Sequence, residues 1–176
     1  MKINASITAN FFLKKARQEK IPVTPMKLQK LVYIAHGWVL AILGNETGVL
    51  DNEEIQAWQH GPVIPSLYHE FKHIQNSPIN DWSRSLLKIT DSQFVTNPVH
   101  FEEVEEENKK QLQEILNAVW EAYKNYTAWG LSQKTHEKET PWNEVYVEGK
   151  KHIAISNELI RKYYQNYLHK LMENND

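Results

Sequence analysis

Apolar residues between Thr24 and Gly44 alternate in steps of three and four, which is the period of one face of an α-helix. This stripe consists of Leu28, Leu31, Ala35, Trp38 and Ile42. It is widened nearly all the way round by Val32, Ile34, Val39 and Leu43. Thr24 suits the N-cap and Pro25 suits the first helical position, where its missing N–H costs nothing. We therefore expect a central, buried helix over this segment.

Four more segments carry helical signals. One runs from Ser6 to Glu19, and another begins at Pro65 and continues to about Gln75. A third begins in the acidic stretch at residues 101–110, and its apolar face consists of Leu112, Ile115, Leu116, Val119, Tyr123 and Tyr126. The fourth can be capped by Ser156, and the residues expected to face inward are Leu159, Ile160, Tyr163, Tyr167, Leu168 and Leu171.

The remaining segments have no clear helical period. Pro62 and Pro65 push the residues before them away from helical geometry, so residues 58–65 are expected to be extended or turned. Residues 86–100 have mixed β character, and residues 132–152 are predicted to be an irregular connection. Since no repeat or linker divides the chain, we expect a mainly α fold: a single compact helical domain over residues 1–176, built around the central buried helix. The sequence leaves undecided whether the fold also contains a short β-hairpin.

Composition and charge narrow the chemistry. The 176 residues are 41% hydrophobic and include no cysteine, which excludes disulfides, cysteine-based zinc sites and thiol nucleophiles. The formal net charge is −2, yet residues 1–50 hold seven Lys or Arg against two acids, whereas residues 51–107 hold three against eleven. Such asymmetry favours protein partners over nucleic acid. The apolar run Leu31–Leu43 is too short to span a bilayer and the N-terminus lacks a secretory-signal pattern, so we expect a cytoplasmic protein without membrane contact.

Lysines near the N-terminus raise the question of DNA binding. Two predicted helices joined by residues 21–25 loosely resemble a helix-turn-helix. A recognition helix presents polar residues to base edges, whereas the second helix here is apolar nearly all round. We therefore expect no direct contact with nucleic acid, and we place at the rim of the domain the basic residues Lys14, Lys15, Arg17, Lys20, Lys27 and Lys30.

A second candidate chemistry is the H-E-x-x-H pattern formed by His69, Glu70 and His73. On a helix, two histidines four residues apart share a face and can ligate zinc, while the glutamate activates a water molecule. Lys72 would place a positive charge beside the metal, and no third ligand stands out in the sequence. The competing interpretation is an exposed helix face, which we favour. A zinc-dependent hydrolase is kept only as a remote alternative.

His36, inside the apolar helix, is the other candidate for catalysis or metal binding. A histidine in such a position is more often a core residue whose ring nitrogens are bonded to neighbours. Gly37 beside it predicts a close helix crossing. The chain has no G-x-S-x-G, Walker or Rossmann pattern, so we expect neither an enzyme nor a cofactor.

Three sequence blocks together resemble the Panacea domain family, which includes SocA-like antitoxins and GepA-like phage-associated proteins. The blocks are "KLQKLVYIAHGW" (27–38), "IQAWQHGPVIPSLYHEFK" (55–72) and "LSQKTHEKETPW" (131–142). The resemblance extends over about residues 5–165. It implies a mainly helical antitoxin that neutralises a cognate protein toxin by direct contact. The family also includes an adaptor that delivers its toxin to a Clp-type protease, which is the alternative mechanism.

The resemblance assigns a structural or partner-binding role to Trp38, Trp58, His60, Gly61, Pro62, Val63, Tyr68, Thr135, His136, Pro141 and Trp142. It implies that Tyr68 and Phe71 face inward while His69 and His73 lie on the surface. We expect Trp58 to hold the Gly-Pro turn against the central helix and Trp142 to pin its loop onto the core. The expected binding surface combines the Gly-Pro segment, the adjoining helix and the Thr-His loop. The acidic residues between Asp51 and Glu107 are predicted to meet a basic toxin.

Overall fold

The structure is a computed structural model that describes residues 3–44, 46, 48–83, 89–90, 93–94 and 106–173. Its helices are α1 (Ala5–Glu19), α2 (Pro25–Ile42), α3 (Pro65–Phe71), α4 (Glu106–Tyr123), α5 (Ala128–Thr135), α6 (Pro141–Val145) and α7 (Asn157–Glu173). A 3₁₀ turn at Lys72–Ile74 follows α3 directly. The predicted mainly α fold, a single domain around a central helix, is confirmed.

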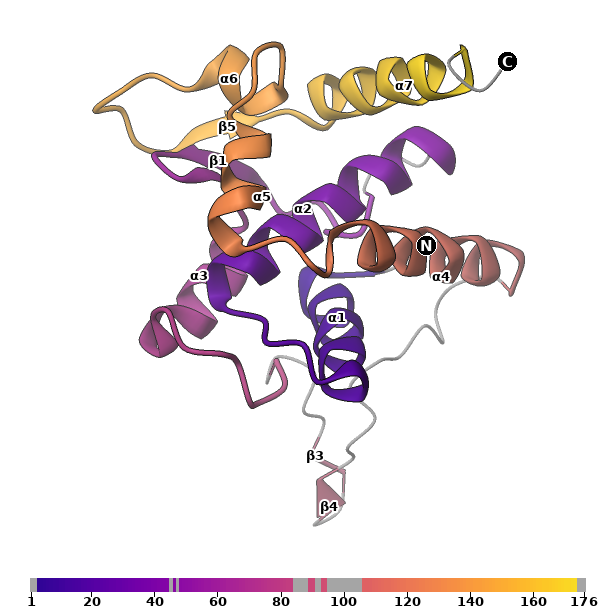
Figure 1. Cartoon of the computed structure of the whole chain (residues 1–176), viewed down its shortest axis with the longest axis vertical. Coiled ribbons are helices and arrows are strands. Elements are labelled where there is room, and N and C mark those ends of the chain that lie inside the picture. Colours follow the sequence, from indigo (N-terminus) through magenta and orange to yellow (C-terminus); the bar gives the residue numbers. More distant parts are fainter. Residues whose placement is uncertain are drawn as a thin grey trace.

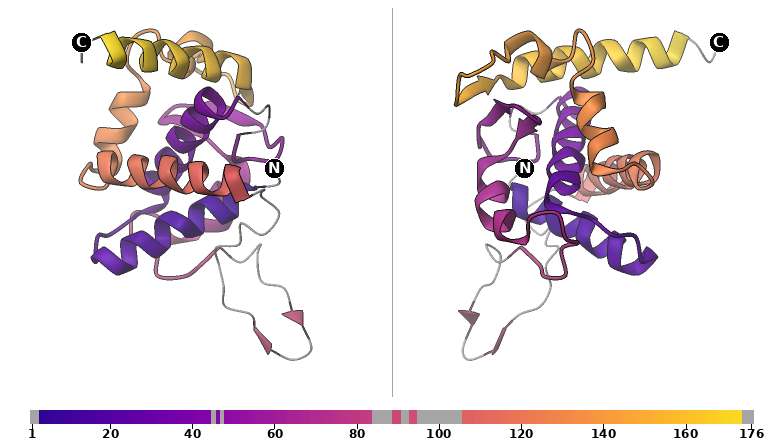
Figure 2. Two further views of the ribbon diagram at one scale, coloured as in Figure 1. Left: turned by 90° about the vertical axis from the view of Figure 1, so that its right-hand side faces the viewer. Right: turned by 60° about the vertical axis from the view of Figure 1, so that its left-hand side comes forward.

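Helix α2 runs through the middle of the molecule, with α7 on one side and α1 on the other (Figures 1 and 2). It packs against α1, α3, α4, α5, α7 and strand β2 (Gly61–Val63). Thr24 caps it by accepting a hydrogen bond from the Lys27 amide, and Pro25 occupies its first turn, as the sequence predicts. Burial continues round most of its circumference, which explains why its apolar pattern has no clean polar face.

A three-stranded antiparallel sheet lies beside α2, in the order β2-β1-β5. Its other strands are β1 (Ile55–Trp58) and β5 (Ile153–Ile155). In the hairpin β1–β2, Trp58 pairs with Gly61, so Gln59 and His60 form the turn. A separate two-residue pair joins β3 (Ile89–Thr90) to β4 (Gln93–Phe94) within the stretch predicted to have β character.

Residues 132–152 were expected to be irregular, and this prediction is wrong. The segment contains the end of α5 and the whole of α6. Each helix begins with a capping threonine: Thr127 accepts from the Gly130 amide, and Thr140 accepts from the Asn143 amide. Both helices are too short to show a helical period, so the caps were the only local signal.

Helix α7 begins as predicted, because Ser156 Oγ accepts a hydrogen bond from the Leu159 amide at 3.2 Å. Its inward face is only partly as predicted. Ile160 and Tyr164 are buried, whereas Tyr167 and Leu171 are each 41% exposed. Tyr164 is buried because α7 crosses α2 closely at Gly37, where a Cβ atom would lie 2.1 Å from the Tyr164 ring. The predicted close approach at Gly37 is thus confirmed, and the helix continues beyond the core after it (Figure 1).

No helix in the described ranges combines the length and the apolar character needed to cross a membrane.

Candidate partner-binding site

The turn of the β1–β2 hairpin lies where the three sequence blocks meet. Trp142, in the third block, donates its indole N–H to the carbonyl of Trp58 at 2.7 Å. Its ring is 6% exposed, stacks on Tyr146 with centroids 4.4 Å apart, and lies 3.8 Å from the ring of His136. The expectation that Trp142 pins its segment onto the core is therefore confirmed, and the atom that it holds is a carbonyl of the hairpin.

Two more carbonyls of this turn are bonded to side chains of α5 and of its C-cap residue. The Nε2 atom of His136 lies 3.1 Å from the carbonyl oxygen of Gln59, and Ser132 Oγ donates to the carbonyl of His60 at 3.0 Å. The other ring nitrogen of His136 contacts the carbonyl of Ser132. These contacts fix the backbone of the turn without using the side chains of its two central residues.

Helix α2 holds the next part of the hairpin. Lys30 Nζ donates to the carbonyl of Pro62 at 2.9 Å. Gln29 makes a two-way contact with Ile64, accepting from its amide at 2.8 Å and donating to its carbonyl at 3.1 Å. Lys30 is 1% exposed, and burial lowers its pKa to about 7. Our placement of Lys27 and Lys30 at the rim is therefore wrong, since both are buried and donate to backbone carbonyls.

Gly61 allows these elements to approach one another. Its φ of +100° is strained for any residue with a side chain. A Cβ atom there would lie 2.6 Å from Thr135 Oγ1 and 2.8 Å from Lys30 Nζ. The glycine is therefore required both by the turn and by the contact of the hairpin with α2 and α5.

The outer face of the turn is exposed. Gln59 and His60 face solvent, and Trp129 of α5 is 57% exposed. The His60 ring lies edge-on to Trp129, with centroids 6.4 Å apart. We call Gln59, His60 and Trp129 the turn surface. The resemblance includes His60 among its structural or partner-binding residues, but no sequence pattern singles out Trp129, whose exposure follows from the packing of α5.

Trp58 and Tyr68 do not take the positions expected from the sequence, in which Trp58 holds the turn against α2 and Tyr68 faces inward. Trp58 is half-buried and lies edge-on to Tyr68, with centroids 4.7 Å apart, while Lys30 and Gln29 hold the hairpin against α2. Tyr68 is 38% exposed, so its predicted inward orientation is wrong. Phe71 is buried as predicted. The inward face of α3 belongs to residues four apart, Leu67 and Phe71, and Tyr68 is turned away from it.

The H-E-x-x-H residues are not arranged as a metal site in the part of the chain that the structure describes. Helix α3 ends at Phe71, so His69 and His73 are not on one continuous α-helix. Both are exposed, as the resemblance implies, and Glu70 accepts a hydrogen bond from Ser83 Oγ at 2.6 Å. Within the described ranges, no third metal-binding side chain joins them.

His36 is a core residue, as the more common interpretation predicts. Its Nδ1 accepts from the Val49 amide at 3.3 Å, so its Nε2 carries the proton and donates to Asn157 Oδ1 at 2.8 Å. Burial lowers the pKa of His36 to about 4. Gly48 is required beside it, because a Cβ atom there would lie 2.2 Å from His36 Nδ1.

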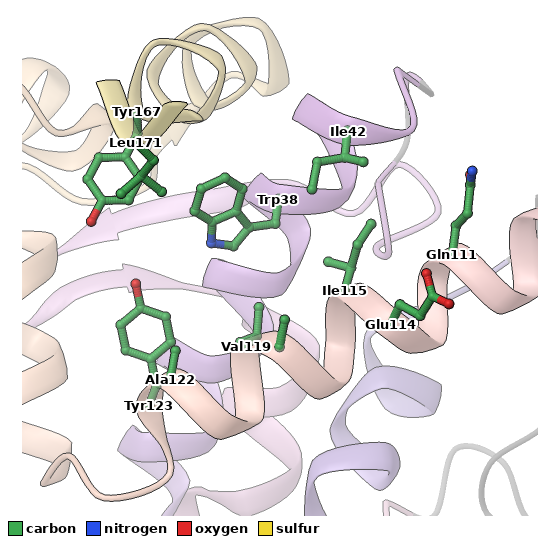
Figure 3. A pocket seen from close by; sticks show the side chains of 11 residues that line it. Trp38, Ile42, Gln111, Glu114, Ile115, Val119, Ala122, Tyr123, Tyr167 and Leu171 are labelled. Atoms are coloured by element: carbon green, nitrogen blue, oxygen red, sulfur yellow. The ribbon is translucent and has the colours of Figure 1, made fainter. Parts of the chain in front are cut away.

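A second surface feature is an apolar groove of about 620 Å³ between α2, α4 and α7 (Figure 3). Trp38 lies at its centre, half-buried, with its ring 5.2 Å from that of Tyr164 and 5.7 Å from that of Tyr167. Ile42 is 49% exposed at one end. Exposed apolar surface of this kind is typical of contacts between proteins.

The family model described as "Antitoxin SocA-like, Panacea domain" matches residues 28–143, a range that contains every residue of the turn surface. This chain belongs to the SocA-like Panacea domain family. The extension of the resemblance to residues 5–165 stays a prediction outside the matched range. The chain is similar to Antitoxin SocA of Caulobacter vibrioides, with 32% identity over 106 residues, which cover 59% of this chain and 54% of that protein. It thus spans about half the length of this curated relative. No solved structure matches the chain.

Proposed function

We propose that this protein is an antitoxin that binds a cognate protein toxin directly, and that the turn surface is part of the contact. One observation carries the proposal: four carbonyls of the hairpin are bonded to side chains of other elements, while its turn side chains remain exposed. A surface held in its bound shape loses little conformational entropy on association. Trp129 beside it is of the residue type most enriched among energetically dominant interface positions.

Binding without catalysis fits the state of the buried basic groups. Among the residues that the structure describes, Lys30 and His36 are buried basic groups whose pKa values are lowered, to about 7 and about 4, and such groups can serve in acid–base chemistry. Lys30 donates to the backbone of the hairpin, and both ring nitrogens of His36 are bonded to groups of the fold. These groups stabilise the domain and leave the exposed surface to act by contact.

A proteolytic adaptor that delivers the toxin to a Clp-type protease is the second candidate. The apolar groove favours it, since an adaptor needs one surface for its cargo and another for the protease. The groove and the turn surface share no residue.

The test is co-expression with the cognate toxin, identified first as a product of a neighbouring gene that stops growth when it is expressed alone. We expect the wild-type protein to restore growth, and the double variant His60→Ala/Trp129→Ala to lose rescue at an unchanged protein level. The matched control is Leu171→Ala, which truncates an exposed apolar residue of the groove. Full rescue by the double variant would overturn the assigned surface. Rescue that disappears in a host without Clp protease would replace direct inhibition by the adaptor mechanism.

A further inference from the structure

A groove opens beside the turn surface, where strands β1 and β5 separate. The two strands pair as far as Ala57 opposite Ile153. Beyond that pair, Trp58 and Gln59 diverge from the segment Gly149–His152, and a cavity of about 600 Å³ lies between them. This volume is typical of ligand-binding clefts, which range from about 300 to 1,000 Å³. In Figure 1 the loop that precedes β5 projects past α6 on the side of β1.

The walls of this groove are aromatic and held in place. Tyr146 stacks on the buried Trp142, with an angle of 17° between the rings. The indole N–H of Trp58 donates to Gln56 Oε1 at 2.9 Å, and His152 Nδ1 lies 3.1 Å from the same oxygen. Gln56 therefore links one wall of the groove to the other. Fixed aromatic walls favour an apolar or aromatic side chain as the occupant.

The rim of the groove is basic. Lys150, Lys151 and His152 are consecutive and exposed, and Glu148 is the one acidic residue of the lining. This contrasts with the chain as a whole, whose formal net charge is −2. The turn that carries the lysines is fixed by a hydrogen bond from the Lys150 amide to the Val147 carbonyl at 3.1 Å and by Gly149 at φ +77°. Positive side chains around apolar walls are complementary to carboxylates that flank an apolar residue.

We propose that this groove binds an acidic peptide segment of the partner protein, with an aromatic or aliphatic side chain between Trp58 and Tyr146 and carboxylates on Lys150 and Lys151. The inference deepens the proposed function and rests on it, because the segment belongs to the bound toxin. It extends the contact from the turn surface across Gln59, which lies in the turn and also lines the groove. The lysines attract the segment over a distance and the aromatic walls select its apolar residue.

The groove can be tested on the purified protein without the toxin. A random peptide library is selected against the wild type, and the enriched sequences are synthesised with a fluorescent label for anisotropy titrations. We expect Asp and Glu on both sides of an aromatic or aliphatic residue. Lys150→Glu/Lys151→Glu should weaken binding by about tenfold or more, as should high salt. The matched control is Lys14→Glu/Lys15→Glu, which reverses another adjacent pair on α1 and should change the Kd less than about twofold.

Several results would overturn the proposal. The first is a peptide selection that yields no binder, and the second is one that enriches basic or uncharged sequences instead of acidic ones. The third is a set of selected peptides whose Kd is the same for the wild type and for Lys150→Glu/Lys151→Glu. A labelled oligothymidylate that binds more tightly than the peptides, and loses binding in the same variant, would assign the groove to nucleic acid instead. Competition with the cognate toxin then tests whether the segment belongs to the toxin. Displacement of the labelled peptide by the toxin supports this source, and simultaneous binding of peptide and toxin overturns it. Failure of growth rescue is a separate result, since it concerns the proposed function and not the groove.

Discussion

Replacing Lys30 by methionine tests whether the hairpin is held by a buried amine. Methionine keeps an unbranched chain of similar length and removes both the charge and the hydrogen bond to the Pro62 carbonyl. Burial lowers the pKa of Lys30 from 10.5 to about 7, and no carboxylate in the described part of the chain offsets this cost. A shift of this size corresponds to at most about 5 kcal/mol, since one pH unit is worth about 1.4 kcal/mol.

The sign of the pH dependence follows from which state binds the proton. Between pH 7 and pH 10.5 the unfolded chain keeps the Lys30 proton while the folded protein releases it. The free energy of unfolding therefore rises with pH in this window, by about 1.4 kcal/mol per pH unit at most. Below pH 7 both states carry the proton and the contribution is constant. The Lys30→Met variant lacks this contribution entirely.

The assay is urea unfolding followed by tryptophan fluorescence at pH 6, 7, 8 and 9. The free energy of unfolding of the wild type minus that of Lys30→Met should be constant below pH 7 and rise above it. Other titrating groups cancel in this difference because both proteins share them. Lys138→Met, which changes an exposed lysine, should show no such rise. A difference that stays flat or falls between pH 7 and pH 9 would refute a buried Lys30 amine whose pKa is lowered in the folded protein.

Three further substitutions test the packing around the site and the core. Gly61→Ala should lower the free energy of unfolding by roughly 3 kcal/mol in urea titrations, because of its φ of +100° and the two close contacts of its Cβ. The control Gly149→Ala, with positive φ but open space around it, should cost only about 1 kcal/mol, so equal losses would contradict the steric argument. Gly37→Ala should cost about 1–3 kcal/mol alone and little in the background of Tyr164→Ala, and additive losses would show that the two residues are not in contact. His36, with its pKa lowered to about 4, binds a proton in the unfolded chain from pH 6.5 downward. Stability should therefore fall by about 3 kcal/mol as the pH drops from 6.5 to 4, and His36→Gln should remove this part of the loss in acid unfolding curves.

The helices that have a long apolar period were predictable from the sequence. The stripe of α2, the Thr24 cap and the close crossing at Gly37 are confirmed. For these features the local pattern and the tertiary contact favour the same structure. The short helices α5 and α6 were missed because their order comes from capping threonines and from contacts with distant segments.

The polar residues of the site were harder to predict. Gln29 and Lys30 carry no apolar period, and a lysine is almost never fully buried, so the sequence favoured a solvent-exposed position. Their burial depends on the hairpin, whose carbonyls they bind from more than thirty positions away in the chain. The exposure of Tyr68 likewise depends on which residues of the short α3 contact the core.

The predicted role of the acidic stretch in meeting a basic toxin falls largely outside the described residues. Glu102, Glu103 and Glu105 are among the residues that the structure does not describe, and for Glu106 it describes the backbone only. Their part in binding stays a prediction. This prediction can be tested separately from the groove before β5. Reversing the charge of these glutamates would weaken contacts with basic groups of the partner, whereas reversing Lys150 and Lys151 would weaken contacts with its acidic groups.

Titrating the purified cognate toxin into this protein in a calorimeter shows whether the turn surface of the β1–β2 hairpin binds the toxin. Trp129→Ala should raise the Kd by about tenfold or more, with an unchanged free energy of unfolding, while Leu171→Ala should bind as the wild type does. A Trp129→Ala variant that binds with the wild-type Kd, together with a Leu171→Ala variant that does not, would contradict this expectation and move the contact to the groove between α2, α4 and α7.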